Sequence, residues 1–346
     1  MRHTFIYLFL IAVLCLAVVA ALALGAMQIS FTEVIAILAK SAGLKITTSI
    51  DPINEGVVTM IRLPRLLMGI LVGAALGISG AAIQGIFRNP LAEPGLVGIS
   101  SGASLMAVVI IAFETVWFSS MSQILGYYLL ALGAFVGAGI SALLVYNLSK
   151  TDGKANVVTM LLVGIAINAL AGALTGLVSY LSDEQQLRSI TFWMLGSLSG
   201  ASWQNVSCLA PFVLIALIGL PFFSKGLNVF AIGERQADMI GLNPNFIKAS
   251  VVILSTMAVG ASVSVSGIIG FVGLLVPHLV RLLGGVNHRF VLPASALLGA
   301  LVLTVSDLIS RLIVQPIELP IGVVTALLGT PIFLYILIRD KKKLIH

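Results

Sequence analysis

Long apolar runs separated by short polar segments occupy this chain from end to end. A helix that crosses a bilayer needs about 20 predominantly apolar residues. The sequence therefore predicts about ten membrane-spanning helices, near residues 5–29, 66–86, 96–113, 124–148, 157–181, 205–223, 246–265, 267–283, 291–312 and 321–338. Only Ser262–Gly267 separates the seventh from the eighth, and a helix too short to span is expected at Ser189–Leu198. The pattern indicates an all-α, polytopic membrane protein with one transmembrane domain over residues 1–346.

Composition supports this assignment. Of the 346 residues, 59% are hydrophobic and 9% are charged, whereas soluble domains carry roughly 25% charged residues. The first 26 residues resemble a signal peptide, but their apolar run exceeds the ~7–15 residues of a typical signal core. We therefore expect a first helix that stays in the membrane. The net charge of +6 is spread thinly between apolar runs, which does not favour nucleic-acid binding.

The basic residues predict an orientation. With the N-terminus inside, inner segments hold most of the 19 basic residues, and cytoplasmic loops are usually the richer in Lys and Arg. The outer segments hold only Lys40, Lys45, Arg62, Arg65, Arg188 and Arg311, while the inner ones end with Lys341–Lys343. Both termini are therefore expected in the cytoplasm.

A compact polar segment interrupts the apolar pattern between the second and third predicted spans. Two prolines in it remove backbone donors and stop the preceding helix. We expect a tight elbow on the cytoplasmic side, made of Arg88, Asn89, Pro90, Glu93 and Pro94.

Several chemistries are disfavoured by what the sequence lacks. A phosphate-binding loop needs Gly-Lys followed by Ser or Thr, but Ala155 follows Gly153-Lys154. The histidines show no metal-ligand spacing, and no catalytic set can be assembled near the membrane centre. Ion-coupled carriers usually keep charges within their spans. Apart from Lys248 and Arg281, which are counted with the inner segments, only Asp307 and Arg311 intrude here, near an outer helix end and at a spacing that allows them to pair. Energy for transport would have to come from another protein.

The inner loop at residues 226–244 is the best candidate for binding such a protein. Residues Asn228–Met239 combine apolar and polar side chains as a short amphipathic helix does. Gly241 is expected to end this helix, and Pro244 blocks its continuation. An alternative is a helix that lies on lipid headgroups.

Five separated motifs, one of them in two parts, resemble the FecCD family, the permease subunits of bacterial ABC importers for iron–siderophore, heme and cobalamin. They include RNPLAEPGLVGISSGA at the elbow, AIGERQADMIGLN in the inner loop, IRLPR with SDLISRL at predicted outer helix ends, GFVGLLVPHLVRLLGG and ELPIGVVTALLGTPIFLYIL. The resemblance implies the fold of a type II ABC importer permease in the inner membrane. It also implies a homodimer, two ATPase subunits that carry ATP and Mg²⁺, a periplasmic binding protein, and no cofactor or metal on this chain.

The resemblance also implies roles for particular residues. Contact with the ATPase would involve Asn228, Phe230, Gly233, Glu234, Arg235, Asp238 and Gly241. Docking of the binding protein would use Arg62, Arg65 and Arg311, which could instead be helix-end anchors. The segment Ser182–Trp203 reads most like heme permeases, with Arg188 attracting propionates at the pathway mouth. Ferric siderophore and cobalamin are alternative cargoes, and a channel or receptor without an ATPase is the alternative class.

Overall fold

The computed structural model describes residues 2–25, 27–44, 50–126, 128–151, 153–314 and 317–344. Lys45 and the side chains of Lys341–Lys343, which contribute to the predicted orientation, lie outside the described residues.

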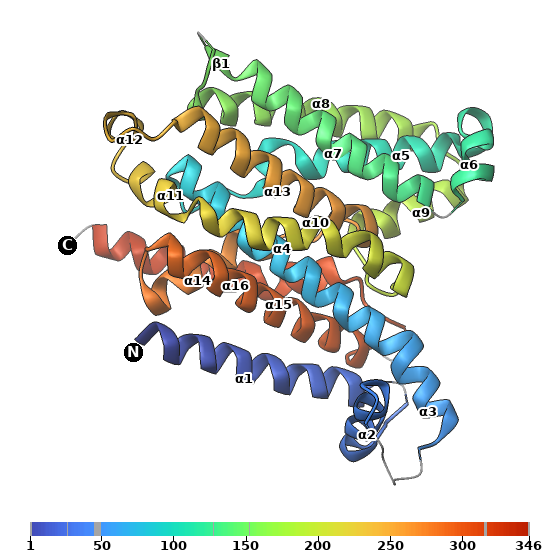
Figure 1. Ribbon diagram of the computed structural model, residues 1–346. Helices are drawn as coiled ribbons and strands as arrows, with labels where there is room; N and C mark the ends of the chain where they lie inside the picture. Colours follow the sequence, from blue (N-terminus) through green and yellow to red (C-terminus); the bar gives the residue numbers. More distant parts are fainter. Residues whose placement is uncertain are drawn as a thin grey trace.

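The chain is almost entirely helical, with one two-stranded hairpin (Figure 1). In chain order the elements are α1 (Arg2–Ala23), α2 (Phe31–Ser41), α3 (Pro52–Gly56), the π-helix η1 (Val57–Arg62), α4 (Leu63–Phe87), the 3₁₀ turn η2 (Pro94–Val97), α5 (Ile99–Trp117), α6 (Ser119–Leu125), α7 (Tyr128–Leu148), β1 (Lys150–Thr151), β2 (Lys154–Ala155), α8 (Val157–Tyr180), α9 (Glu184–Leu195), α10 (Trp203–Phe222), α11 (Ser224–Phe230), α12 (Glu234–Met239), α13 (Pro244–Ser266), α14 (Val272–Gly284), α15 (His288–Leu312) and α16 (Ile321–Leu344).

Each predicted span coincides with a helix. Within the described ranges, nine helical segments are long and apolar enough to cross a membrane. The remaining predicted span is α14, which has 13 residues. It begins at Val272 rather than near residue 267, because Gly267 and Phe271 both have positive φ and interrupt the helical path. The apolar residues around 267–271 do not indicate this interruption in the sequence.

Two segments predicted as outer loops contain helices. Residues 30–65 hold α2 and the continuous helical segment from Pro52 into α4, so the second span begins earlier than expected. The short helix expected at Ser189–Leu198 is α9, which starts earlier, at Glu184. Asp183 explains this start, because its side chain accepts from the backbone N–H of Gln186 while Gln186 reaches back, forming a capping box.

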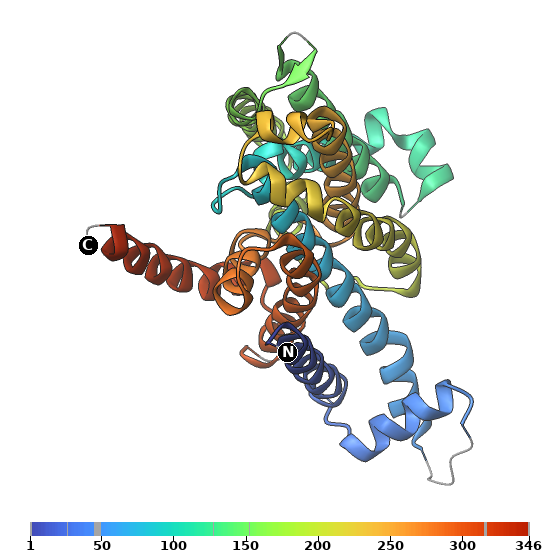
Figure 2. The ribbon, with the colours of Figure 1, turned by 60° about the vertical axis from the view of Figure 1, so that its left-hand side comes forward.

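Helix α4 forms the centre of the bundle and is buried over most of its length. It packs against α10, α13, α14 and α15. The contact with α15 is backbone to backbone: a Cβ added at Gly73 would lie 2.3 Å from the carbonyl oxygen of Gly299, and one at Gly77 would lie 2.1 Å from that of Ser295. Only glycine permits this approach. By contrast, α16 diverges from the rest of the bundle (Figure 2).

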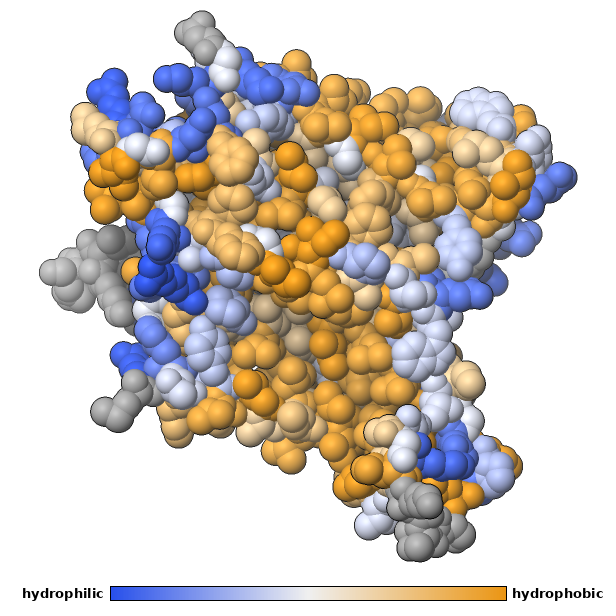
Figure 3. Space-filling view, in the orientation of Figure 1, coloured by the Kyte–Doolittle hydropathy of each residue, from blue (hydrophilic) through white to orange (hydrophobic). Residues whose placement is uncertain are grey.

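The bundle has two distinct ends. The N-terminal helix start, the β1–β2 hairpin, α11 and α12 gather at one end, here called the α12 end, while α2, α6 and α9 gather at the other, the α9 end (Figure 1). Hydrophilic residues concentrate at these ends, and an apolar belt lies between them on the face shown in Figure 3. This distribution fits a protein that crosses a bilayer many times.

Candidate functional site

The segment predicted to bind a partner at the α12 end is a pair of short helices. Leu227 and Phe230 are buried and hold α11 against the bundle. Gly233, with φ 149°, separates the two helices, and Gly241, with φ 81°, follows the end of α12. The Asn243 side chain then accepts from the backbone of Phe246 to start α13. The predicted helix stop at Gly241 is confirmed.

Apolar side chains project from this helix pair into solvent. Ile232, Met239 and Ile240 are 72%, 83% and 63% exposed. Charged and polar neighbours, Arg235 and Asp238, are exposed beside them. We call these five residues the coupling surface. A mixed patch of this kind at the end of a bundle is typical of a surface that contacts another protein or the membrane.

Glu234 contributes to the structure of the coupling segment rather than to its free surface. Its carboxylate lies 2.9 Å from Nζ of Lys248, whose side chain is only 1% exposed and also donates to the carbonyl of Ala155. The pair therefore ties α12 to α13 and the hairpin. The sequence did not single out Lys248, and a lysine within the start of an otherwise apolar span is the signal that could have found it.

Asn228 makes a second link, from α11 to α15. Its Oδ1 accepts from the backbone N–H of His288 at 2.8 Å, and its Nδ2 donates to Asn287 at 2.9 Å. Asn228 and Phe230, both predicted as partner contacts, thus hold the helix pair to the bundle. Arg235 and Asp238 are the predicted charged residues that remain available at the surface.

The elbow forms as predicted. Helix α4 ends at Phe87 with Arg88 in the left-handed conformation, and Asn89 Oδ1 accepts from the backbone of Leu91. Burial raises the pKa of the Glu93 carboxyl above its ordinary value. The elbow and α11 border one cavity of about 640 Å³, lined among others by Arg88, Asn89, Asn228, Arg281 and His288. Two motifs far apart in the sequence therefore meet at the α12 end.

Charged side chains form a network near the α9 end, and all of them except Glu318 are largely buried. Arg65 contacts Asp307 at 2.9 Å and Glu318 at 2.8 Å, and Arg311 contacts Asp307 at 3.1 Å. The expected pairing of Asp307 with Arg311 is confirmed. No local pattern indicated that Glu318 would join them, although a carboxylate beside a predicted helix start was a visible candidate.

Arg62 is also engaged within the chain. It is 6% exposed and donates to the carbonyls of Leu22, Ala23 and Met27. These carbonyls lie at and just beyond the end of α1, where backbone acceptors lack helical partners. A guanidinium there satisfies them and complements the helix dipole.

Docking of a binding protein through Arg62, Arg65 and Arg311 stays a prediction, although all three side chains are largely buried within the single chain. All three lie against acceptors of this same chain, and docking through them would first have to break those contacts. The alternative of helix-end anchors agrees better with their positions.

Arg188 lies differently. It is exposed on α9, and no ion pair joins it to any residue that the structure describes. Phe192, one turn later on the same helix face, is 61% exposed. A free cation beside an exposed aromatic ring offers both charge and apolar contact.

Comparison with known proteins gives consistent matches. The model of the FecCD transport family matches residues 11–339. The hemin transport system permease protein HmuU of Yersinia pestis is 43% identical over 284 residues, covering 82% of this chain and 83% of that protein. The cobalamin import system permease protein BtuC of Halobacterium salinarum is 39% identical over 286 residues, covering 83% and 74%.

A solved structure of a metal-chelate type ABC transporter in an inward-facing conformation resembles the fold. The TM-score is 0.84 at 30% sequence identity, and the match covers 97% of this chain and 99% of that chain. The likeness therefore extends over the whole bundle.

Proposed function

Because the chain belongs to the FecCD transport family and is a permease of ABC importers for iron complexes or cobalamin, we propose that it moves heme across the inner membrane. It is a multi-pass membrane protein with the fold of a type II importer permease.

We place the ATPase subunits at the coupling surface. The α12 end carries the exposed apolar side chains Ile232 and Met239, and the short helices beneath them are tied to α13 and α15 by Glu234 and Asn228. ATP-driven movement of the ATPases would pass through these links to two long helices at once. ATP and Mg²⁺ belong to the ATPases, and this chain carries no cofactor in the proposal. The α12 end, with both termini, then faces the cytoplasm.

A second copy of the chain and a periplasmic binding protein complete the proposed importer. Helices α8 and α16 are apolar, and few of their described residues are buried in the single chain. Figure 2 shows α16 extending outward from its contacts with α14 and α15, which leaves room for another copy to pack against it. The binding protein would dock at the α9 end and deliver the cargo between the two copies.

Arg188 is the observation that carries the choice of heme. Heme is a flat apolar ligand with carboxylates, and Arg188 with Phe192 provides one exposed cation and one exposed ring on the same face. The 43% identity to a hemin permease supports the same choice.

Transport in a reconstituted complex tests the cargo. The permease with its ATPase and binding protein is placed in proteoliposomes, and uptake of hemin, a ferric siderophore and cobalamin is measured. We expect ATP-dependent uptake of hemin, and a lower initial rate for Arg188→Gln. Lys40→Gln is the matched control, because Lys40 is a cation at the same end that is already paired with Glu55. Uptake of cobalamin or siderophore without hemin would refute the proposal.

Cobalamin is the second candidate cargo, favoured by the match to a cobalamin permease. It has no carboxylate that needs Arg188. If cobalamin is the cargo, Arg188→Gln should leave its uptake unchanged.

A further inference from the structure

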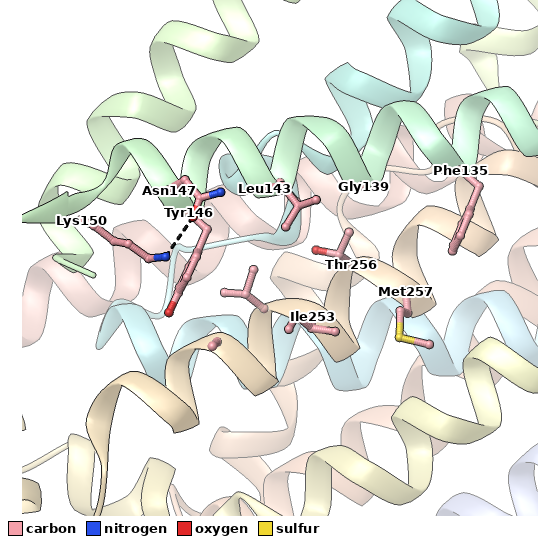
Figure 4. Close-up of a pocket in the computed structure, with 12 residues that line it drawn as sticks. Phe135, Gly139, Leu143, Tyr146, Asn147, Lys150, Ile253, Thr256 and Met257 are labelled. Carbon is pink, nitrogen blue, oxygen red and sulfur yellow. Dashed lines mark hydrogen bonds between the residues drawn. The ribbon is translucent and has the colours of Figure 1, made fainter. Parts of the chain in front are cut away.

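A groove in the apolar belt runs between α7 and α13, on the face of the bundle shown in Figure 1. Its volume is about 420 Å³, within the roughly 300–1,000 Å³ range of small-molecule sites. Helix α7 lines one wall from Phe135 to Tyr146, and α13 lines the other from Ala249 to Met257. Most of the surface inside is apolar (Figure 4).

The groove has one polar end. Lys150 donates from Nζ to Asn147 Oδ1 at 2.9 Å and lies 4.8 Å from the ring centre of Tyr146 (Figure 4). These three residues lie at the α12 end, whereas Phe135 and Met257 lie at the deep end. No carboxylate lines the groove among the described residues, so Lys150 is its charged group.

The length of the groove matches one leaflet. Phe135 and Tyr146 are eleven positions apart on α7, which is about 16 Å at the ~1.5 Å rise of a helix. Half of the hydrocarbon core of a bilayer is about 15 Å. Lys150 lies in β1, just beyond the end of α7, which is where lipid headgroups would lie if the groove spans one leaflet.

We propose that this groove binds one phospholipid with an anionic headgroup, its acyl chain between α7 and α13 and its phosphate at Lys150. The apolar walls accommodate the chain, and the lysine selects for negative charge at the one end where a headgroup can lie. Tyr146 adds an amphipathic ring at the same depth, as aromatic residues do at membrane interfaces. The site is separate from the coupling surface and from Arg188.

Gly139 provides a way to block the groove without disturbing the helix. It lines the groove, and a Cβ added there meets no atom within 4 Å. A leucine at this position fills space that is otherwise open, and leucine favours a helix over glycine.

The experiment uses the assembled importer in nanodiscs that contain phosphatidylglycerol carrying a photoactivatable group on one acyl chain. Peptide mapping after illumination is expected to locate the label on α7 and α13 along the groove. Phosphatidylcholine with the same chain is expected to label these helices less. Unlabelled phosphatidylglycerol should compete better than unlabelled phosphatidylcholine in the unmutated protein.

Two variants and a control sharpen the test. Gly139→Leu should abolish labelling along the groove. Lys150→Gln should lower labelling by phosphatidylglycerol roughly fivefold, which corresponds to about 1 kcal/mol for one basic residue at a membrane surface. Lys154→Gln removes a nearby exposed lysine that does not line the groove, and should change nothing.

Equal labelling and equal competition by the two lipids would overturn the proposal, because the groove would then hold bulk lipid without selection. Labelling that appears in the isolated permease but is lost in the assembled importer would also overturn it, because a protein partner would then cover the groove.

Discussion

Asp307 is the residue whose replacement should most clearly reveal how the α9 end is held together. Its carboxylate contacts Arg65 at 2.9 Å and Arg311 at 3.1 Å, and all three side chains are at least nine-tenths buried. Glu318 provides the second carboxylate, at 2.8 Å from Arg65. Two positive and two negative groups balance. Asp307→Asn keeps the shape of the side chain but leaves one positive charge without a counter-charge.

The expected cost follows from burial. Breaking a buried ion pair by removing one partner typically costs about 3–5 kcal/mol, since the remaining charge stays away from water. The amide oxygen of asparagine can still accept one hydrogen bond, so we expect the lower part of this range, about 3 kcal/mol. Asp307→Asn with Arg311→Gln restores the charge balance. The double variant should therefore lose less stability than the summed losses of the two single variants, by about 0.5–3 kcal/mol.

The assay is equilibrium unfolding of the purified permease in mixed micelles, followed by tryptophan fluorescence. Glu55→Gln is the control at the same end, because it breaks the Lys40–Glu55 pair, whose side chains are 53% and 32% exposed. An exposed pair should contribute only about 0.2–1 kcal/mol. A cost for Asp307→Asn no larger than that of the control would refute the reasoning.

Three further predictions concern the α12 end. Glu93→Gln should raise the free energy of unfolding at neutral pH. Because the pKa of Glu93 is raised in the folded protein, the carboxyl costs no stability at low pH, where it is protonated, and costs stability once pH rises through the folded-state pKa. The difference in the free energy of unfolding between variant and parent should therefore vanish in acid. A difference independent of pH in unfolding titrations would contradict this. Glu234→Ala should destabilise the protein by roughly 1–3 kcal/mol, less than a fully buried pair because Glu234 is 35% exposed, and Lys248→Met in the same chain should recover part of the loss. No recovery in the double variant would show that the two residues do not act as a pair. Met239→Glu with Ile232→Ser should leave thermal stability unchanged but weaken binding of the ATPase at least tenfold, or about 1.4 kcal/mol, in a pull-down titration with purified subunits. Unchanged binding would exclude the coupling surface.

The sequence predicted the features that depend on local pattern. Spans were recognisable because apolar length alone identifies them, and the elbow was recognisable because Pro90 and Pro94 stop helices. The pairing of Asp307 with Arg311 followed from helical spacing. Each of these signals comes from residues that are close together in the sequence.

Features that depend on distant contacts could not be predicted in this way. Arg65 meets Glu318 across 253 positions, and Arg62 meets backbone carbonyls of α1, which have no sequence signature at all. The same reason explains why the burial of these arginines could not be predicted, because an arginine at a helix end looks exposed until the neighbouring helix is in place. Gly267 and Phe271 interrupt the path before α14 through backbone angles that their apolar neighbours do not indicate.

The burial of Lys248 also gives the coupling segment a chemical signature. An amine that is shielded from solvent and bonded to a carboxylate is a poor nucleophile toward water-soluble acylating reagents. Lys225 and Lys154, at the same end of the molecule, are exposed, so the reagents are expected to acylate them. The extent to which Lys248 is acylated relative to these two therefore reports how often α12 leaves its place, and this ratio can be followed through a transport cycle on the unmutated protein.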